Sequence, residues 1–133
     1  MILVKTRLAV SGVHGIGLFA DQFIPKGTKT FEFIPWFDVS FTESDLAKMS
    51  EECRRQVLWY AYLDKKTNKY ALLSDDYRFI NHSQDVTRVN IESTPDIDIA
   101  LRDIQSGEEL LCNYNKFDDT YFPRMGLKET DLK

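Results

Sequence analysis

The sequence predicts a mainly β domain with one small helical insertion. Short runs of β-forming residues, separated by turn residues, recur along most of the chain. Residues 42–58 differ, because their composition favours helix and their apolar residues recur at helical spacing. A length of 133 residues suits a single domain over residues 1–133, and no internal repeat or linker divides it.

Two strands are predicted in the first third of the chain. Residues 2–10 alternate weakly between apolar and polar and end at a Ser-Gly turn. The Pro-Lys-Gly run at residues 25–27 marks a second turn. Residues 28–33 then alternate β-formers with charged residues, which predicts a strand.

The densest aromatic cluster of the chain overlaps this strand. Burial in the core is the expected role for most of its members, because large rings bury much apolar surface. These residues are Phe31, Phe33, Trp36, Phe37 and Phe41.

The helical insertion has two candidate starts. Ser40 with Glu43, or Thr42 with Asp45, has the spacing of a capping box. Ser50 is a candidate start for a second short helix.

A hairpin is predicted after the helix. Residues 57–63 are β-like, residues 64–68 form a polar turn, and residues 69–74 return as the partner strand.

A run of three polar side chains follows apolar residues at a predicted turn. Asn81, His82 and Ser83 offer several hydrogen-bond donors and acceptors at this point. Such side chains either bond their own backbone or bind a ligand, and the run alone leaves both roles open.

Three strands are predicted after this turn. Residues 86–91 form the first, before Pro95 interrupts. Residues 97–102 alternate apolar with mostly polar residues, which is typical of a half-buried strand. A Gln-Ser-Gly turn at 105–107 leads into a final strand over residues 109–114.

Charge is unevenly distributed along the chain. The formal net charge is −4, yet residues 75–119 contain eleven acidic and four basic residues, a net of −7 that leaves +3 elsewhere. An acidic surface repels nucleic-acid phosphates and attracts a basic peptide, and an ordinary solvated acidic face has the same composition. Nucleic-acid binding is disfavoured in both cases.

Composition indicates a soluble globular protein, with 43% apolar and 29% charged residues. No apolar run approaches the roughly 18 residues that a membrane helix needs, and the apolar start is too short for a secretory signal. We therefore expect a cytoplasmic protein without membrane association. Cys53 and Cys112 are too few for a disulfide framework or a zinc site, so no metal is expected.

Three motifs, in this order, resemble the SET-domain protein lysine methyltransferases. They are Gly-Ile-Gly at residues 15–17, Arg-Phe-Ile-Asn-His-Ser at 78–83, and Gly-Glu-Glu-Leu at 107–110 with Asn-Tyr at 113–114. The resemblance covers residues 3–115, with 40–75 as a variable insertion. It implies the SET-domain (β-clip) fold of several short curved sheets with a C-terminal pseudoknot.

The resemblance also implies an enzyme that uses S-adenosylmethionine to methylate lysine side chains of a protein, such as a histone or another basic protein. Asn81 would bond the amino-acid portion of the cofactor, backbone groups of His82 would meet the adenine, and Tyr114 would be the catalytic residue beside the transferring methyl. The implied cofactor-binding residues in these motifs are Gly15, Ile16, Gly17, Arg78, Phe79, Asn81 and His82.

The lysine channel departs from the family pattern. The Tyr-x-Gly of many relatives is absent from residues 31–35, so the channel aromatic must come from elsewhere, and four candidates remain: Trp36, Phe37, Tyr60 and Tyr62. Many relatives place Phe or Tyr two residues before the catalytic tyrosine, a position that Cys112 occupies here. The channel is predicted to comprise Tyr60, Tyr62, Cys112 and Tyr114.

The C-terminal segment departs as well. The zinc-binding cysteines that follow the domain in some relatives are absent, so residues 115–133 are expected to close the cofactor pocket. Phe117, Tyr121 and Phe122 are available to stack on adenine, or they are terminal core residues. A homodimer is another way to complete the pocket.

Two other functions stay open. One is a catalytically inactive SET module that binds a partner protein through the same cleft, and the other is an unrelated β-rich structural domain. A eukaryotic origin, or action in a host cell, would place the protein in the nucleus instead of the cytoplasm.

Overall fold

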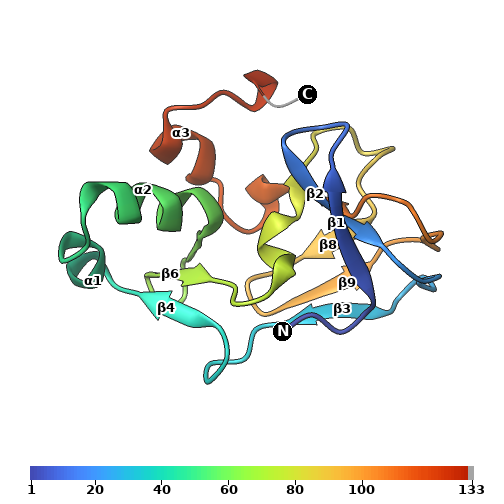
Figure 1. Cartoon of the computed structure of the whole chain (residues 1–133), viewed down its shortest axis with the longest axis horizontal. Coiled ribbons are helices and arrows are strands. Elements are labelled where there is room, and N and C mark those ends of the chain that lie inside the picture. The colour runs from blue at the N-terminus through green and yellow to red at the C-terminus, as the bar shows by residue number, and fades with distance from the viewer. Residues whose placement is uncertain (132–133) are drawn as a thin grey trace.

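Four small β-sheets make up most of the structure, a computed structural model that describes residues 1–131 (Figure 1). Two sheets have two strands, two have three, and three short α-helices accompany them in this part of the chain. The predicted mainly β fold with a small helical insertion is confirmed. None of the helices described is long and apolar enough to cross a membrane.

The main body contains a hairpin and a three-stranded sheet. The hairpin pairs β1 (Thr6–Val10) with β2 (Ile16–Ala20). The antiparallel sheet has the order β3, β9, β8, and these strands cover Lys29–Glu32, Ile97–Ala100 and Ile91–Ser93.

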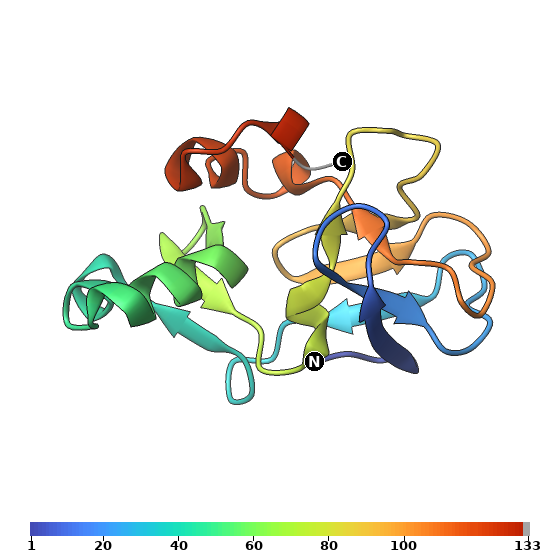
Figure 2. The same ribbon diagram turned by 45° about the horizontal axis from the view of Figure 1, so that its top comes forward.

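The insertion forms a lobe at one side of the molecule, on the left in Figures 1 and 2. Its antiparallel sheet has the order β4, β6, β5, which cover Val39–Phe41, Lys69–Leu72 and Tyr62–Asp64. Helices α1 (Glu43–Ala47) and α2 (Glu51–Tyr60) lie beside this sheet. Leu46, Ala61 and Tyr70 are the buried centre of the lobe's own apolar cluster.

Side-chain caps start both helices of the lobe. Thr42 Oγ1 accepts from the Asp45 N–H at 3.0 Å, and the Asp45 carboxylate accepts from the Thr42 N–H at 2.9 Å. The second of the two predicted capping boxes is therefore the one that forms. Ser50 Oγ accepts from the Cys53 N–H at 3.2 Å, which confirms the predicted second helix.

The predicted strand over residues 57–63 is wrong for its first half. Helix α2 continues to Tyr60, and the Ala61 N–H still donates to the Val57 carbonyl at 2.8 Å. Only from Tyr62 does the chain pair as β5, so the helical ladder overrides the β preference of the aromatic residues.

Two very short strands form a crossing near the C-terminus. β7 (Asn81–His82) pairs in parallel with β10 (Leu111–Cys112). Asn90 also binds β10. Its Oδ1 accepts from the Leu111 N–H at 2.9 Å, and its N–H donates to the Leu111 carbonyl at 3.1 Å. The last segment thus passes between two earlier ones, as the predicted pseudoknot requires.

The crossing corrects three predictions. Residues 81–82 form a strand and not a turn, and the 3₁₀-helix η1 (Asp76–Phe79) precedes them. Residues 86–88 form a turn that Asp85 caps, so the predicted strand over 86–91 is wrong and β8 begins only at Ile91. The predicted strand over 109–114 forms a ladder only within β10, with Glu109 in an isolated bridge to Phe19, and the 3₁₀-helix η2 (Tyr114–Lys116) follows.

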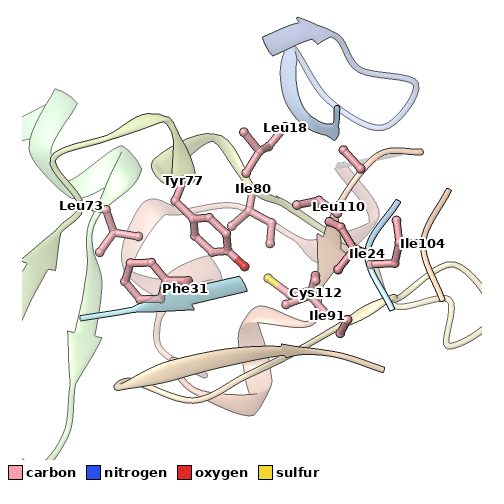
Figure 3. Close-up of a cluster of buried hydrophobic side chains, with 12 residues drawn as sticks. Leu18, Ile24, Phe31, Leu73, Tyr77, Ile80, Ile91, Ile104, Leu110 and Cys112 are labelled. Carbon is pink, nitrogen blue, oxygen red and sulfur yellow. The ribbon is translucent and has the colours of Figure 1, made fainter. Parts of the chain in front are cut away.

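The main core lies between the hairpin and the three-stranded sheet, with Tyr77 near its centre (Figure 3). The Tyr77 ring stacks on Phe31 with centroids 4.8 Å apart. Phe31 and Phe33 belong to this core and Phe41 packs in the lobe, but Trp36 is 80% exposed, against the predicted tendency of the aromatic cluster. The buried members of the main core are Leu18, Ala20, Ile24, Phe31, Leu73, Tyr77, Ile80, Ile91, Ala100, Ile104, Leu110 and Cys112.

Strand β9 turns the unexpected face to the core. Its alternation favours burial of Ile97 and Ile99, yet both are partly exposed, while Asp98 and Ala100 are buried. The reversal is tolerated because the Tyr77 hydroxyl donates to Asp98 Oδ2 at 2.9 Å. Burial raises the pKa of the Asp98 carboxyl to about 7.

The C-terminal segment is fastened across the lobe, with α3 (Tyr121–Met125) beside α2 (Figures 1 and 2) and the 3₁₀-helix η3 (Glu129–Asp131) after it. Asp118 Oδ2 accepts from the Leu63 N–H and from Arg124 Nη1, each at 2.9 Å. Arg124 Nη2 also donates to the Ala61 carbonyl at 2.9 Å. Both members of the Asp118–Arg124 ion pair are largely buried.

Replacement of Arg124 by Met should lower the free energy of unfolding by about 3–5 kcal/mol, because Asp118 is left buried without its cation. Urea denaturation measures this change. The matched control is Lys65→Met, which breaks the exposed Lys65–Asp119 pair and should change stability little. Equal effects of the two substitutions would contradict the role given to Arg124.

Asp98 should make stability depend on pH with a defined sign. Its folded pKa of about 7 lies above its ordinary value of 3.8, so its contribution is fully present below pH 4 and is lost as pH rises through 7. Between pH 4 and pH 8, wild type should therefore lose a few kcal/mol of unfolding free energy relative to Asp98→Asn. The expected loss is roughly 1.4 kcal/mol for each unit by which the pKa is raised. Urea denaturation across this range measures it, and a flat difference would contradict the assignment.

Candidate active site

A cavity of about 240 Å³ lies where the main body, the lobe and the C-terminal segment meet. Its walls come from the β1–β2 loop, the end of α2 with β5, the η1–β7 segment, the β8–β9 turn and the segment after β10. Nine of the predicted site residues line it: Gly15, Ile16, Tyr60, Tyr62, Arg78, Phe79, Asn81, Tyr114 and Tyr121. Residues from distant parts of the sequence thus meet at one hollow.

Asn81 holds the glycine loop in place. Its Nδ2 donates to the carbonyls of His14 and Ile16, at 2.9 and 3.2 Å, and to Glu109 Oε1 at 3.1 Å. Asn81 is buried on β7, so the amide is in a fixed position. One side chain therefore links all three sequence motifs.

Gly17 does not line the cavity, although it was predicted to approach a ligand. A Cβ built on Gly17 would lie 2.2 Å from Glu109 Oε1, which also accepts from Ser11 Oγ at 2.6 Å and from Asn81. The absent side chain makes room for this carboxylate. Gly17 thus acts on the cavity only through Glu109.

His82 supports Tyr114 from outside the cavity wall. Its Nδ1 accepts from the Tyr114 N–H at 3.0 Å, so a neutral ring carries its proton on Nε2. Nε2 lies 2.9 Å from Glu129 Oε1 without the alignment of a hydrogen bond, and the Phe122 ring packs edge-on at 4.9 Å. Burial lowers the pKa of His82 despite the nearby Glu129 carboxylate, which favours the neutral ring.

Phe122 and Cys112 are also behind the wall. Phe122 is buried and stacks near Tyr114 with centroids 6.0 Å apart, which is the core role that the sequence left open for it. Cys112, which was predicted to line the substrate channel, is fully buried in the main core and does not line the cavity. Burial raises the pKa of its thiol, which is therefore protonated.

Tyr114 is surrounded by aromatic rings at the cavity wall. His82, Phe117 and Tyr121 lie within 5.1–6.0 Å of its ring, centroid to centroid. Its hydroxyl donates to the Ile80 carbonyl at 2.5 Å, and burial raises its pKa well above the ordinary value. Tyr114 is therefore a neutral phenol whose proton is engaged, and its oxygen lone pairs remain free to accept.

Two of the four candidate channel aromatics line the cavity. Tyr62 donates its hydroxyl to the Pro95 carbonyl at 2.7 Å and packs against Phe117, and Tyr60 packs against Phe79. Burial raises the pKa of Tyr62, so it too is a neutral phenol. Trp36 and Phe37 are not part of the wall.

Several wall residues were missed from the sequence. His14 and Trp59 face each other with ring centroids 5.9 Å apart, and Leu127 lies on the same wall. A second missed group is polar and consists of Tyr77, Ser93, Thr94 and Asp98. The strand prediction for residues 57–63 hid Trp59, and the reversed phase of β9 hid Asp98. Within residues 1–131, no three His, Cys, Asp or Glu side chains come together as a metal site requires.

Comparison with known proteins agrees with this arrangement. The family model of the SET domain matches residues 15–115. No relative was found among curated protein sequences.

Solved structures give the same fold. An active polycomb repressive complex 2 in the basal state is similar at 24% identity and a TM-score of 0.62, over 84% of this chain and 15% of that chain. The Chaetomium thermophilum polycomb repressive complex 2 is similar at 25% identity and a TM-score of 0.57, over 84% of this chain and 15% of that chain. A Plasmodium falciparum protein, provisionally assigned as a histone methyltransferase, is similar at 23% identity and a TM-score of 0.59, over 85% of this chain and 95% of that chain.

The chain thus spans about 15% of the length of the polycomb chains and nearly all of the Plasmodium chain. A family match over residues 15–115 covers most of the 133 residues and all three motifs. The chain belongs to the SET-domain family.

Proposed function

We propose that this protein is a protein-lysine N-methyltransferase that uses S-adenosylmethionine. The family generally has this activity. The observation that carries the proposal is the cavity, in which the Gly15–Ile16 backbone, Asn81 and the Tyr114 phenol come together.

The cavity wall fits the cofactor chemically. The Arg78 guanidinium is a partner for a carboxylate, and Tyr121, Trp59 and Leu127 offer apolar surface for a purine. Gly15 has φ +52°, a conformation that brings backbone close to the cavity without a side chain. When bound, S-adenosylmethionine supplies a methyl group on a positively charged sulfur.

Tyr114 has the properties that this chemistry needs. A neutral phenol oxygen with free lone pairs stabilises positive charge nearby, and more so where water is excluded. Bound to Ile80 and surrounded by rings, the hydroxyl needs little reorganisation. Methyl transfer is an in-line displacement, so this positioning is the main contribution.

The aromatic wall suits a lysine side chain. Tyr60, Tyr62 and Phe117 present apolar faces to its methylene stem. A lysine must lose its proton before it attacks, and desolvation in such surroundings lowers the pKa of the amine.

The acidic half of the chain supports a basic protein as the substrate, a histone being one example. Residues 75–119 carry the net charge of −7 and include β7 to β10 beside the cavity. One solved polycomb structure in the fold comparison is described as a complex with H3K27me3 and H3K27M. Homodimerisation and cytoplasmic or nuclear location stay predictions.

The second candidate is a SET module without activity that binds a partner through this cavity. The departures at residues 31–35 and after residue 115 favour it, whereas the presence of both Tyr114 and Asn81 on the cavity wall favours the enzyme. Methyl transfer separates the two.

Tyr114→Phe should retain the fold and reduce methyl transfer by about 100-fold or more, because the oxygen beside the reacting methyl is lost. Transfer of labelled methyl from S-adenosylmethionine to basic proteins, including histones, measures this. Tyr70→Phe is the matched control, since Tyr70 is buried in the lobe and its hydroxyl bonds Glu43 away from the cavity. Unchanged turnover in Tyr114→Phe would rule out its catalytic role, and cofactor binding without any label would favour the inactive module.

Gly17→Ala should weaken S-adenosylmethionine binding by about tenfold, the equivalent of one hydrogen bond. The added methyl displaces Glu109 from Asn81 and Ser11 and so loosens the glycine loop. Calorimetric titration measures the affinity. Gly12→Ala is the control, because its Cβ meets nothing within 4 Å, and equal affinities in the two variants would contradict the Glu109 link.

A further inference from the structure

The end of the C-terminal segment contacts both the cavity and the histidine behind its wall. After α3 the segment runs back from the lobe towards the main body (Figures 1 and 2). Leu127 lines the cavity, and two residues later Glu129 Oε1 lies 2.9 Å from His82 Nε2. Neither Glu129 nor His82 lines the cavity, so their contact has no part in the binding surface described above.

The His82 ring connects Glu129 to Tyr114. One ring nitrogen, Nε2, faces the Glu129 carboxylate, and the other, Nδ1, accepts from the Tyr114 N–H at 3.0 Å. A neutral imidazole has a single proton, so Nδ1 can accept only while that proton is on Nε2. The group that faces Nε2 therefore decides whether the bond to Tyr114 forms.

The proton on Nε2 needs an acceptor, because a buried N–H without one is costly. The His82 side chain is 1% exposed, and Nε2 has no aligned hydrogen bond within residues 1–131. Glu129 Oε1 is within hydrogen-bond distance of it. The ring is held by Tyr114 and Phe122, whereas the Glu129 side chain is 29% exposed, so the carboxylate is the group with room to turn into line.

Glu129 is held in place by its own segment. Asn115 Nδ2 donates to the same oxygen, Glu129 Oε1. The Asp131 carboxylate accepts from the Lys128 N–H at 2.8 Å and so closes the turn that contains Glu129. Two donors, from Asn115 and His82, thus face one oxygen, and an amide oxygen would serve them as well as a carboxylate oxygen.

We propose that Glu129 is a positioning residue for Tyr114. Glu129 Oε1 keeps the His82 proton on Nε2, and Nδ1 then fixes the Tyr114 backbone at the start of η2. The C-terminal segment accordingly has two roles, because Leu127 completes the cavity wall and Glu129 orients the tyrosine. This assignment rests on the proposed function, since it concerns the tyrosine of that reaction.

The two roles should affect different steps. Loss of the Glu129 oxygen should lower turnover, because the Tyr114 phenol is less precisely placed. Cofactor affinity should change little, because neither Glu129 nor His82 is on the cavity wall.

The test compares Glu129→Leu, a side chain of similar size without an acceptor, with Glu129→Gln, which keeps an oxygen for both donors. Thr130→Ala, at an exposed position of the same 3₁₀-helix, is the control. Measurements are made at about pH 8, where the His82 ring is neutral. Hydrogen exchange of the Tyr114 N–H reports its bond to His82, and nitrogen-15 NMR of the two histidine rings reports which nitrogen has the proton.

Glu129→Leu should speed exchange of the Tyr114 N–H by about tenfold or more, the equivalent of one hydrogen bond, and move the ring proton in part to Nδ1. The Leu111 N–H, which bonds Asn90 in the same crossing, should exchange as in wild type. Turnover in methyl transfer should fall by about tenfold, with S-adenosylmethionine affinity within about twofold of wild type. Glu129→Gln and Thr130→Ala should match wild type in every measurement.

Equal exchange of the Tyr114 N–H in wild type and Glu129→Leu would overturn the proposal. Faster exchange at both Tyr114 and Leu111 would also overturn it, because it indicates general loosening, and so would failure of Glu129→Gln to match wild type. A wild-type His82 ring with its proton on Nδ1 would overturn it even if no variant folds.

The exchange and ring measurements need no activity, so the two proposals fail separately. Faster exchange at Tyr114 alone, in a protein that binds no S-adenosylmethionine, would support the positioning role and contradict the proposed function. Methyl transfer by wild type with unchanged Tyr114 exchange in Glu129→Leu would support the proposed function and contradict the positioning role.

Discussion

The parallel pairing of β7 with β10 is the contact on which the site depends. It is only two residues long, yet it fixes Asn81 and His82 against Leu111 and Cys112. From this pair, the Asn81 amide reaches back to the glycine loop and the His82 ring reaches forward to the backbone of Tyr114. Segments separated by more than sixty residues are thus held at one cavity by side chains of a single short strand.

The three motifs contain most members of this network, because each motif contributes backbone or side-chain groups to its hydrogen bonds. The sequence could not distinguish residues that line the cavity from residues that hold the lining residues in place. Gly17, His82 and Phe122 belong to the same motifs or segment as true wall residues, but they act through Glu109 or Tyr114. Only side-chain packing in three dimensions distinguishes the two layers, so a linear motif contains no signal for it.

The failures of the strand predictions have a common physical cause. In β9 the apolar pattern favours one face, but a hydrogen bond from Tyr77 makes burial of Asp98 tolerable and so allows the other. At the end of α2, the helical ladder extends through residues with high β propensity. In both cases hydrogen bonds override the local preference, and both conceal cavity residues: Asp98 in the first case and Trp59 in the second.

Two buried groups set opposite pH requirements on this structure. The folded pKa of His82 lies below its ordinary 6.5, so its contribution to stability is lost as pH falls below that value, whereas that of Asp98 is lost as pH rises through about 7. The fold therefore favours a neutral His82 and a protonated Asp98, so its stability is greatest between the pH ranges in which either group becomes charged.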